Sequence, residues 1–262
     1  MEMNFTSAAE KQKQLMKSAE KKVFSQFNED GILLWLFDRL GSGDKRFVEF
    51  GIQNGKECNA AHLIINHAWS GLLMEGNPAD AERAAQYYAA QPTVRPGQVT
   101  VKPAFVTSEN INALLADHAS LGPTDLLSLD IDGVDLWVWK AIRAIDPRVV
   151  VIEYNAAFGP ERSVSVINDP AFERFKYHAT GLYHGASLSA FEKVGREKGY
   201  VLVGCESHGV NAFFVKADEA AKAGLVALTP GQAFYEHAWR AARFGAIEKQ
   251  FELIKDLELV EI

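Results

Sequence analysis

Short apolar runs alternate along this chain with longer segments of mixed polarity, and the alternation predicts its elements. Runs such as Val149-Val150-Val151-Ile152 are almost wholly apolar, as strands buried on both faces of a parallel sheet are. Glycine, proline, asparagine and aspartate cluster between the runs and mark turns. We therefore predict strands at residues 46–51, 71–75, 98–106, 126–130, 149–153, 200–204 and 211–215.

Helical spacing fills the intervals between these strands. Asn77-Pro78 is typical of a helix start, and Ser25 is a candidate N-cap for an apolar helix that follows it. Residues 8–40 are expected to form one or two helices ahead of the first strand. Further helices are predicted at about 56–68, 79–90, 108–119, after Gly133, at 186–198, and within 217–262.

Five alternating units and a closing hairpin predict an α/β fold with a doubly wound, seven-stranded, mostly parallel Rossmann-like sheet. The turn between the last two strands is short and polar, so one strand should be antiparallel. Pro103 suits an edge strand. We expect a single domain over 1–262, with N-terminal helices in 1–40, the Rossmann-like core in 46–216 and C-terminal helices in 217–262.

Composition excludes several classes of protein. The net charge is −7 and no basic block follows a phosphate backbone, so nucleic acid is not expected as a partner. No apolar run approaches the length of a membrane span or a signal peptide, which predicts no membrane partner and a cytoplasmic location. Cys58 and Cys205 have no metal-site spacing and are expected to be reduced thiols. The terminal helices allow a homo-oligomer.

The most informative motif surrounds the end of the first strand. Glu49, Gly51 and Gly55 form the pattern E-x-G-x-x-x-G, and Glu75 ends the next strand. Gly51 permits a sharp turn, and Gly55 permits close approach to a ligand. A carboxylate at the position of Glu75 can accept hydrogen bonds from both ribose hydroxyls. This layout is typical of a nucleotide-binding βαβ unit.

A second group of polar residues follows the fourth and fifth strands. Asp130 and Asp132 follow one strand, and Glu153 and Asn155 end its neighbour. Carboxylate and amide oxygens suit Mg²⁺, Mn²⁺ or Ca²⁺, so these four residues are candidate metal ligands. The alternative is that Asp132 or Asp135 caps the helix that begins near Val134 and binds no ion.

The order of these motifs resembles that of FkbM-type class I methyltransferases, which use S-adenosylmethionine (SAM). The likeness spans about residues 24–217. It implies SAM as cofactor, with Glu49, Gly51, Gly55, Glu75 and Asp130 as binding residues. The matching segments are 25–30, 49–55, 127–133, 149–155, 185–187 and 211–214.

The acids are also similar to those of cation-dependent O-methyltransferases. On that likeness Asp130, Glu153 and Asn155 would be metal ligands. Tyr154 intervenes where the plant-type pattern has the acid and the asparagine adjacent, which departs from the family at Glu153. The implied ion is Mg²⁺, or else Mn²⁺ or Ca²⁺.

These resemblances imply O-methylation of a hydroxyl on a small molecule or glycan. Asp130 and His184 are the candidate catalytic residues, and His208 is a second candidate base if no metal takes part. Two alternatives stay open, a non-catalytic SAM-binding or assembly protein and a metal-dependent hydrolase. The intact acids argue against the first, and the ribose-type Glu75 argues against the second.

Residues 156–184 interrupt the alternation with a long stretch rich in glycine, proline, serine and asparagine. Loops of this length inside a compact domain tend to be functional. We therefore expect a lid over the acceptor site that keeps water away from the reacting centre. The alternative is a surface excursion without a role.

Overall fold

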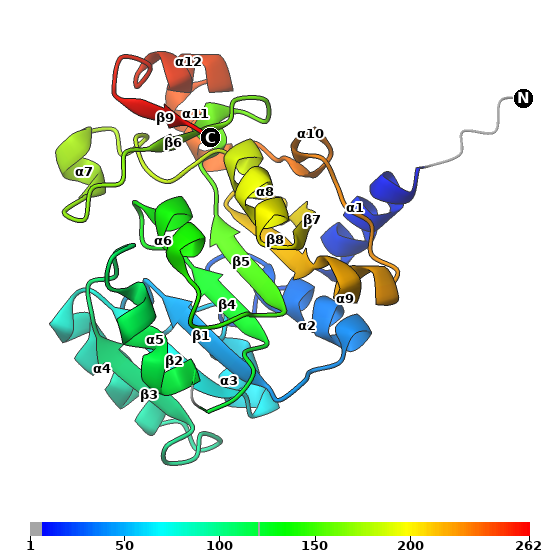
Figure 1. The fold of residues 1–262 in the computed structure, drawn as a ribbon, viewed down its shortest axis with the longest axis vertical. Coiled ribbons are helices and arrows are strands. Elements are labelled where there is room, and N and C mark those ends of the chain that lie inside the picture. The colour runs from blue at the N-terminus through cyan, green and yellow to red at the C-terminus, as the bar shows by residue number, and fades with distance from the viewer. Residues whose placement is uncertain (1–6, 120) are drawn as a thin grey trace, which may run out of the picture.

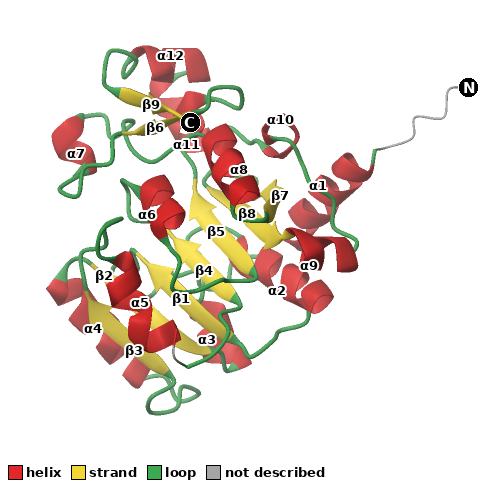
Figure 2. Cartoon of the chain, viewed as in Figure 1, coloured by secondary structure: helices red, strands yellow, loops and turns green. Residues whose placement is uncertain are grey.

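A computed structural model describes residues 7–119 and 121–262, and its centre is one seven-stranded sheet between two layers of helices (Figures 1 and 2). The strand order is β3-β2-β1-β4-β5-β8-β7. The strands are β1 (Arg46–Phe50), β2 (Ser70–Glu75), β3 (Val99–Pro103), β4 (Leu126–Leu129), β5 (Val149–Glu153), β7 (Tyr200–Cys205) and β8 (Asn211–Lys216).

Strand direction confirms the predicted fold class. Strands β3, β2, β1, β4 and β5 pair in parallel, whereas β8 runs antiparallel to both β5 and β7. Strand β3 lies at the edge of the sheet, as Pro103 predicted. The result is a mostly parallel Rossmann-like sheet with one antiparallel strand, as the sequence predicted. Strand order reverses beside β1, where sheets of this kind bind ligands.

Side-chain alternation along the strands builds two separate cores. In β1, Val48 and Phe50 face one core and Phe47 faces the other. Helices α5 (Ile111–Ala119), α6 (Asp135–Ala141) and α8 (Leu188–Glu197) cover the first face. The opposite face is covered by α1 (Ala8–Ala19), α2 (Glu29–Leu40), α3 (Ala61–His67), α4 (Pro78–Ala89) and α9 (Ala217–Lys222).

Helix starts were predicted less well than strands. Asn77 caps α4 as predicted, since its side chain accepts from the N–H groups of Ala79 and Asp80. Ser25 is not an N-cap: Asn28 occupies that position in α2, and the Ser25 hydroxyl donates to Asp30. The first six residues of the predicted N-terminal helical region lie outside the described residues.

The stretch from residue 156 to 184 is not the open loop that its composition suggested. It holds the 3₁₀ turn η1 (Ala156–Phe158), strand β6 (Val164–Val166) and helix α7 (Arg174–Tyr177). Strand β6 pairs with the C-terminal strand β9 (Leu259–Glu261), and Figure 1 shows both beside the helix α12 (Ile247–Glu252). A lid would therefore be confined to about 167–181. The remaining C-terminal helices are α10 (Pro230–Ala233), α11 (Ala238–Phe244) and α12 (Ile247–Glu252).

Candidate active site

Gly51 forms the turn at the end of β1, and its environment requires glycine. Its φ is +72°, a left-handed conformation that side chains disfavour. A Cβ at this position would lie 1.5 Å from the carbonyl oxygen of Asp130. The turns after β1 and β4 are therefore in direct contact, and Gly51 and Asp130 line the same cavity.

Gly55 needs glycine for a different reason from the one expected. Its φ is +79°, and an added Cβ would lie 2.9 Å from the Cβ of Ala84 in α4. The hydroxyl of Tyr88, also in α4, donates to the Gly55 carbonyl at 2.7 Å. The close approach that this glycine permits is to the packed helix α4, and its role in cofactor binding stays a prediction.

Glu49 also has a structural role that the motif did not predict. Its carboxylate accepts from the N–H groups of Asn59 (2.7 Å) and Ala60 (2.8 Å) and from the Ser128 hydroxyl (3.2 Å). These bonds hold the segment that leads into α3, which explains why the helix begins at Ala61. Glu49 is buried, shapes this turn and lines a hollow that also contains Gly51, so its contact with a cofactor stays a prediction.

Burial raises the pKa of Glu49 to about 7, against the opposing effect of its hydrogen bonds. The folded protein thus keeps a proton that the unfolded chain releases near its ordinary pKa of 4.5. Between these values the native state binds more protons, so stability falls as pH rises from about 4.5 to about 7. We expect Glu49 to contribute a loss of about 3 kcal/mol across this window.

Urea unfolding at several pH values measures this loss. Asp135, whose pKa burial also raises to about 7, adds to the wild-type slope. Glu49→Gln should remove the Glu49 share, and Glu57→Gln, which alters an exposed acid of the same turn, should not. An unchanged slope in Glu49→Gln would show that Glu49 does not carry the effect.

Glu75 stands at the end of β2 with its carboxylate fixed from two sides. One oxygen accepts from the N–H of Gln53 at 2.7 Å and the other from the N–H of Asn77 at 2.9 Å. The side chain is only partly buried and lines the cavity that contains Gly51. Each oxygen keeps acceptor capacity toward that cavity.

The cavity lies over the carboxyl ends of β1, β2 and β4 and continues along the β1 turn. Phe105, which follows β3, is 54% exposed there although it is a large apolar side chain. The sequence analysis did not identify it. A second hollow shares Gly51, Gln53 and Asp130 with the first and extends to Asn211. The two hollows therefore adjoin each other at these three residues, and Phe105 lines the first of them.

Asp130 and Asp135 differ in their surroundings, and the difference separates an acid that forms a turn from one that faces the cavity. The Asp135 carboxylate accepts from the N–H groups of Ile131 (2.8 Å) and Gly133 (3.0 Å), so this acid holds the turn before α6. Asp130 is half-buried and faces both hollows. Loss of hydration and the neighbouring Glu153 carboxylate raise the pKa of Asp130 well above its usual range.

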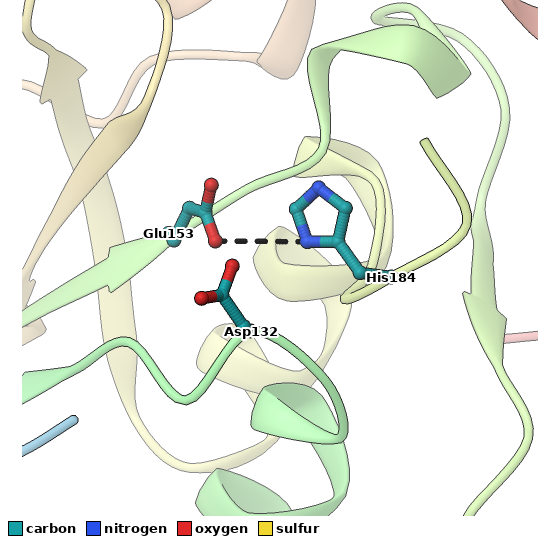
Figure 3. A group of neighbouring side chains, drawn as sticks. All are labelled: Asp132, Glu153 and His184. Carbon is teal, nitrogen blue, oxygen red and sulfur yellow. Dashed lines mark ion pairs between the residues drawn. The ribbon is translucent and has the colours of Figure 1, made fainter. Parts of the chain in front are cut away.

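Asp132, Glu153 and His184 form a compact cluster beside this cavity (Figure 3). One ligand-type atom from each lies within 4.8 Å of the others. Nδ1 of His184 is 3.6 Å from Oε2 of Glu153. His184 is fully buried, and neither ring nitrogen has a hydrogen-bond partner within residues 7–119 and 121–262. Burial lowers the pKa of His184 well below its usual value, so the ring is neutral at pH 7.

Two arginines that the sequence analysis missed border the cluster. Arg240 from α11 is buried and donates to Oε1 of Glu153 at 3.2 Å. Arg174 from α7 donates to Oδ1 of Asp132. Neither lies near its partner in sequence, and neither belongs to a motif, so local patterns offered no signal for them.

Asn155 does not fit the ligand role that the resemblance implied. Its Oδ1 accepts from the N–H of Ala157 and from Nη1 of Arg240, both at 3.1 Å. Its amide nitrogen donates to the carbonyl oxygens of Leu182 and His184. The side chain is fully buried with its bonding capacity in use, so we correct its assignment from metal ligand to a support that positions His184.

His208, the other candidate base, lies in the turn between β7 and β8. Its ring stacks on Phe27 with centroids 5.0 Å apart, and Nδ1 lies 3.1 Å from Oε2 of Glu206. It is not part of the cluster. Of the two histidines, only His184 lies against the predicted acids.

Comparison with families and curated proteins identifies no relative. No family model matches the chain, and no curated protein matches it.

Within residues 7–119 and 121–262, every helix is too short or too polar to cross a membrane. Cys58 and Cys205 are both free and buried, as expected for reduced thiols.

Several solved structures are similar to this chain over most of its length. An O-methyltransferase family protein from Burkholderia thailandensis is 13% identical, with 70% of this chain and 55% of that chain covered and a TM-score of 0.42. The N-terminal domain of EvdMO1 with SAH bound is 13% identical, with 82% and 98% covered and a TM-score of 0.45. The O-methyltransferase TomG from Streptomyces achromogenes, in complex with SAM, is 17% identical, with 80% and 89% covered and a TM-score of 0.42.

Proposed function

We propose that this protein is a SAM-dependent methyltransferase that methylates a hydroxyl oxygen of a small molecule or glycan. The observation that carries the proposal is the fixed Glu75 carboxylate, which faces a cavity bounded by the Gly51 turn and Phe105. Glu75 is suited to accept hydrogen bonds from two ribose hydroxyls. The exposed ring of Phe105 is suited to pack on an adenine. The order of motifs supports the FkbM type within this class.

The hydroxyl acceptor would bind at the cluster of Asp132, Glu153 and His184. SAM supplies a methyl group on a sulfonium, and the protein must orient the acceptor and remove its proton. His184 is neutral and can accept a proton, or the cluster can bind a divalent ion that lowers the pKa of the hydroxyl. Asp130 lines the proposed nucleotide cavity and lies close to Glu153 of the cluster, where it would orient both partners.

The state of His184 favours an enzyme over a non-catalytic binding protein. A buried polar group without a partner costs stability, about 1–3 kcal/mol for a neutral one. A protein that only bound SAM or served assembly would have no use for an imidazole in this condition.

The free and buried cysteines support a cytoplasmic location as part of the proposal.

Cofactor binding gives the direct test. Calorimetry with SAM and S-adenosylhomocysteine should show binding to the wild type, and NAD should not bind. Glu75→Ala should weaken binding by about 1.5–3 kcal/mol, which is roughly tenfold or more, because it removes a charged acceptor. Glu82→Ala, at an exposed acid of the adjacent helix α4, is the matched control and should bind normally. Absence of wild-type binding would refute the proposal.

A further inference from the structure

We propose that Asp132, Glu153 and His184 form a binding site for one first-row transition-metal ion, with Mn²⁺ as the ion to test first. This replaces the all-oxygen set expected from sequence, from which Asn155 is excluded by its own hydrogen bonds. The role of the ion in the reaction rests on the proposed function, whereas the binding of the ion does not depend on it.

The separation of the three side chains fits a shared ion better than direct contacts. The 3.6 Å between Nδ1 of His184 and Oε2 of Glu153 is too long for a hydrogen bond. Two ligands that each lie about 2.0–2.2 Å from one ion are themselves about 3.0–3.6 Å apart. All three ligand atoms lie within 4.8 Å of one another, so small side-chain rotations would bring them to one centre.

The unpartnered ring of His184 is the second, independent observation. The ring is 1% exposed, and both nitrogens lack a donor or acceptor among the described residues. Figure 3 shows the ring edge with Nδ1 turned toward the two carboxylates. A metal ion at this point would satisfy a nitrogen that is otherwise buried at a cost.

The arginines leave the inner carboxylate oxygens available. Arg240 binds Oε1 of Glu153, so Oε2 is the oxygen that faces His184. Arg174 likewise binds Oδ1 of Asp132 and leaves Oδ2. Hydrogen bonds to the outer atoms of ligands are the usual means by which proteins orient a metal site. The two arginines therefore hold the carboxylates in place without occupying the centre.

The donor set selects the kind of ion. An imidazole nitrogen suits transition-metal ions such as Fe²⁺ or Zn²⁺, and the two carboxylates also suit Mn²⁺, whereas Mg²⁺ and Ca²⁺ prefer oxygen ligands alone. Three protein ligands leave positions for a substrate oxygen or water. In the proposed reaction, that open position is where the acceptor hydroxyl would bind and have its pKa lowered.

The test titrates metal-free protein with Mn²⁺ and separately with Mg²⁺, by calorimetry and by the electron paramagnetic resonance of Mn²⁺. Wild-type protein should bind one Mn²⁺ per chain, at least tenfold tighter than Mg²⁺. Asp132→Asn should weaken Mn²⁺ by about tenfold or more, since even the loss of a group behind a ligand costs roughly 10–100-fold. The Asp132 side chain is 55% exposed, so the fold should tolerate the change.

Asp146→Asn is the matched control. Asp146 is another exposed aspartate paired with a cation, Lys216, and it precedes β5 instead of following it. Mn²⁺ should bind this variant as it binds the wild type. His184→Phe should abolish Mn²⁺ binding. The ring nitrogens have no hydrogen bond to lose, so the cost to stability is that of fitting a somewhat larger ring, and the variant should still unfold cooperatively.

Each outcome decides between the proposals. Wild-type protein that binds S-adenosylhomocysteine but prefers Mg²⁺, or binds neither ion, overturns the metal site and leaves the methyltransferase proposal in place. Mn²⁺ binding without S-adenosylhomocysteine binding would support the metal site and refute the methyltransferase proposal. Tight Mn²⁺ binding that persists in both Asp132→Asn and His184→Phe would place the ion elsewhere and also overturn the site.

Discussion

Glu153→Ala is expected to lower the free energy of unfolding by about 3–5 kcal/mol, because it leaves the Arg240 guanidinium buried without its carboxylate. Arg240 is 4% exposed, and it also donates a hydrogen bond to the neutral Asn155. The arginine also ties α11 to the end of β5, so the C-terminal segment should loosen. Equilibrium unfolding in urea measures the loss.

Two comparisons separate this effect from a general loss of charge. Glu248→Ala breaks an exposed ion pair with Arg162, and exposed pairs contribute about 0–1 kcal/mol. It should therefore cost little. The double variant Glu153→Leu/Arg240→Met removes both charges and should recover most of the lost stability, since an apolar pair can replace a buried ion pair. A loss below about 1 kcal/mol in Glu153→Ala would show that Arg240 is not confined as described.

The sheet and the positions of its acids were predictable because they depend on local patterns. Apolar runs identify buried strands, and the residue after each run lies at the carboxyl end of its strand, whichever distant segments contact it. Asp130 and Glu153 were placed beside one another by this reasoning, and the structure does bring them together. Pro103 similarly identified the edge strand, because a missing N–H excludes a central position.

Hydrogen-bond partners were not predictable, because they depend on segments far away in the chain. Arg240 reaches Glu153 across 87 positions, and no motif connects them. The motif that contains Glu49 and Gly55 is compatible with cofactor binding. It is equally compatible with the contacts that Glu49 makes at the start of α3 and that Gly55 makes with α4. His184 lies in a glycine- and tyrosine-rich segment that looked exposed, and it is buried because β6 and β9 cover that segment.

Gly51→Ala is expected to have the second large effect, on both stability and cofactor binding. The added Cβ would lie 1.5 Å from the Asp130 carbonyl oxygen, so the turns after β1 and β4 must separate. Backbone strain in the left-handed region adds about 1–2 kcal/mol to an overpacking cost of about 1–3 kcal/mol. The sum is a loss of about 2–5 kcal/mol in the free energy of unfolding.

Gly97→Ala isolates the contribution of strain. Gly97 has φ +77°, close to that of Gly51, but no atom lies within 4 Å of an added Cβ. It should lose only about 1–2 kcal/mol, the cost of the left-handed conformation. Because displacement of the Asp130 turn would also distort the cavity, Gly51→Ala should bind S-adenosylhomocysteine at least tenfold more weakly, whereas Gly97→Ala should bind it normally. Equal unfolding free energies for the two variants would mean that the β1 and β4 turns can move apart freely. The contact between Gly51 and Asp130 would then be no fixed part of the cavity wall.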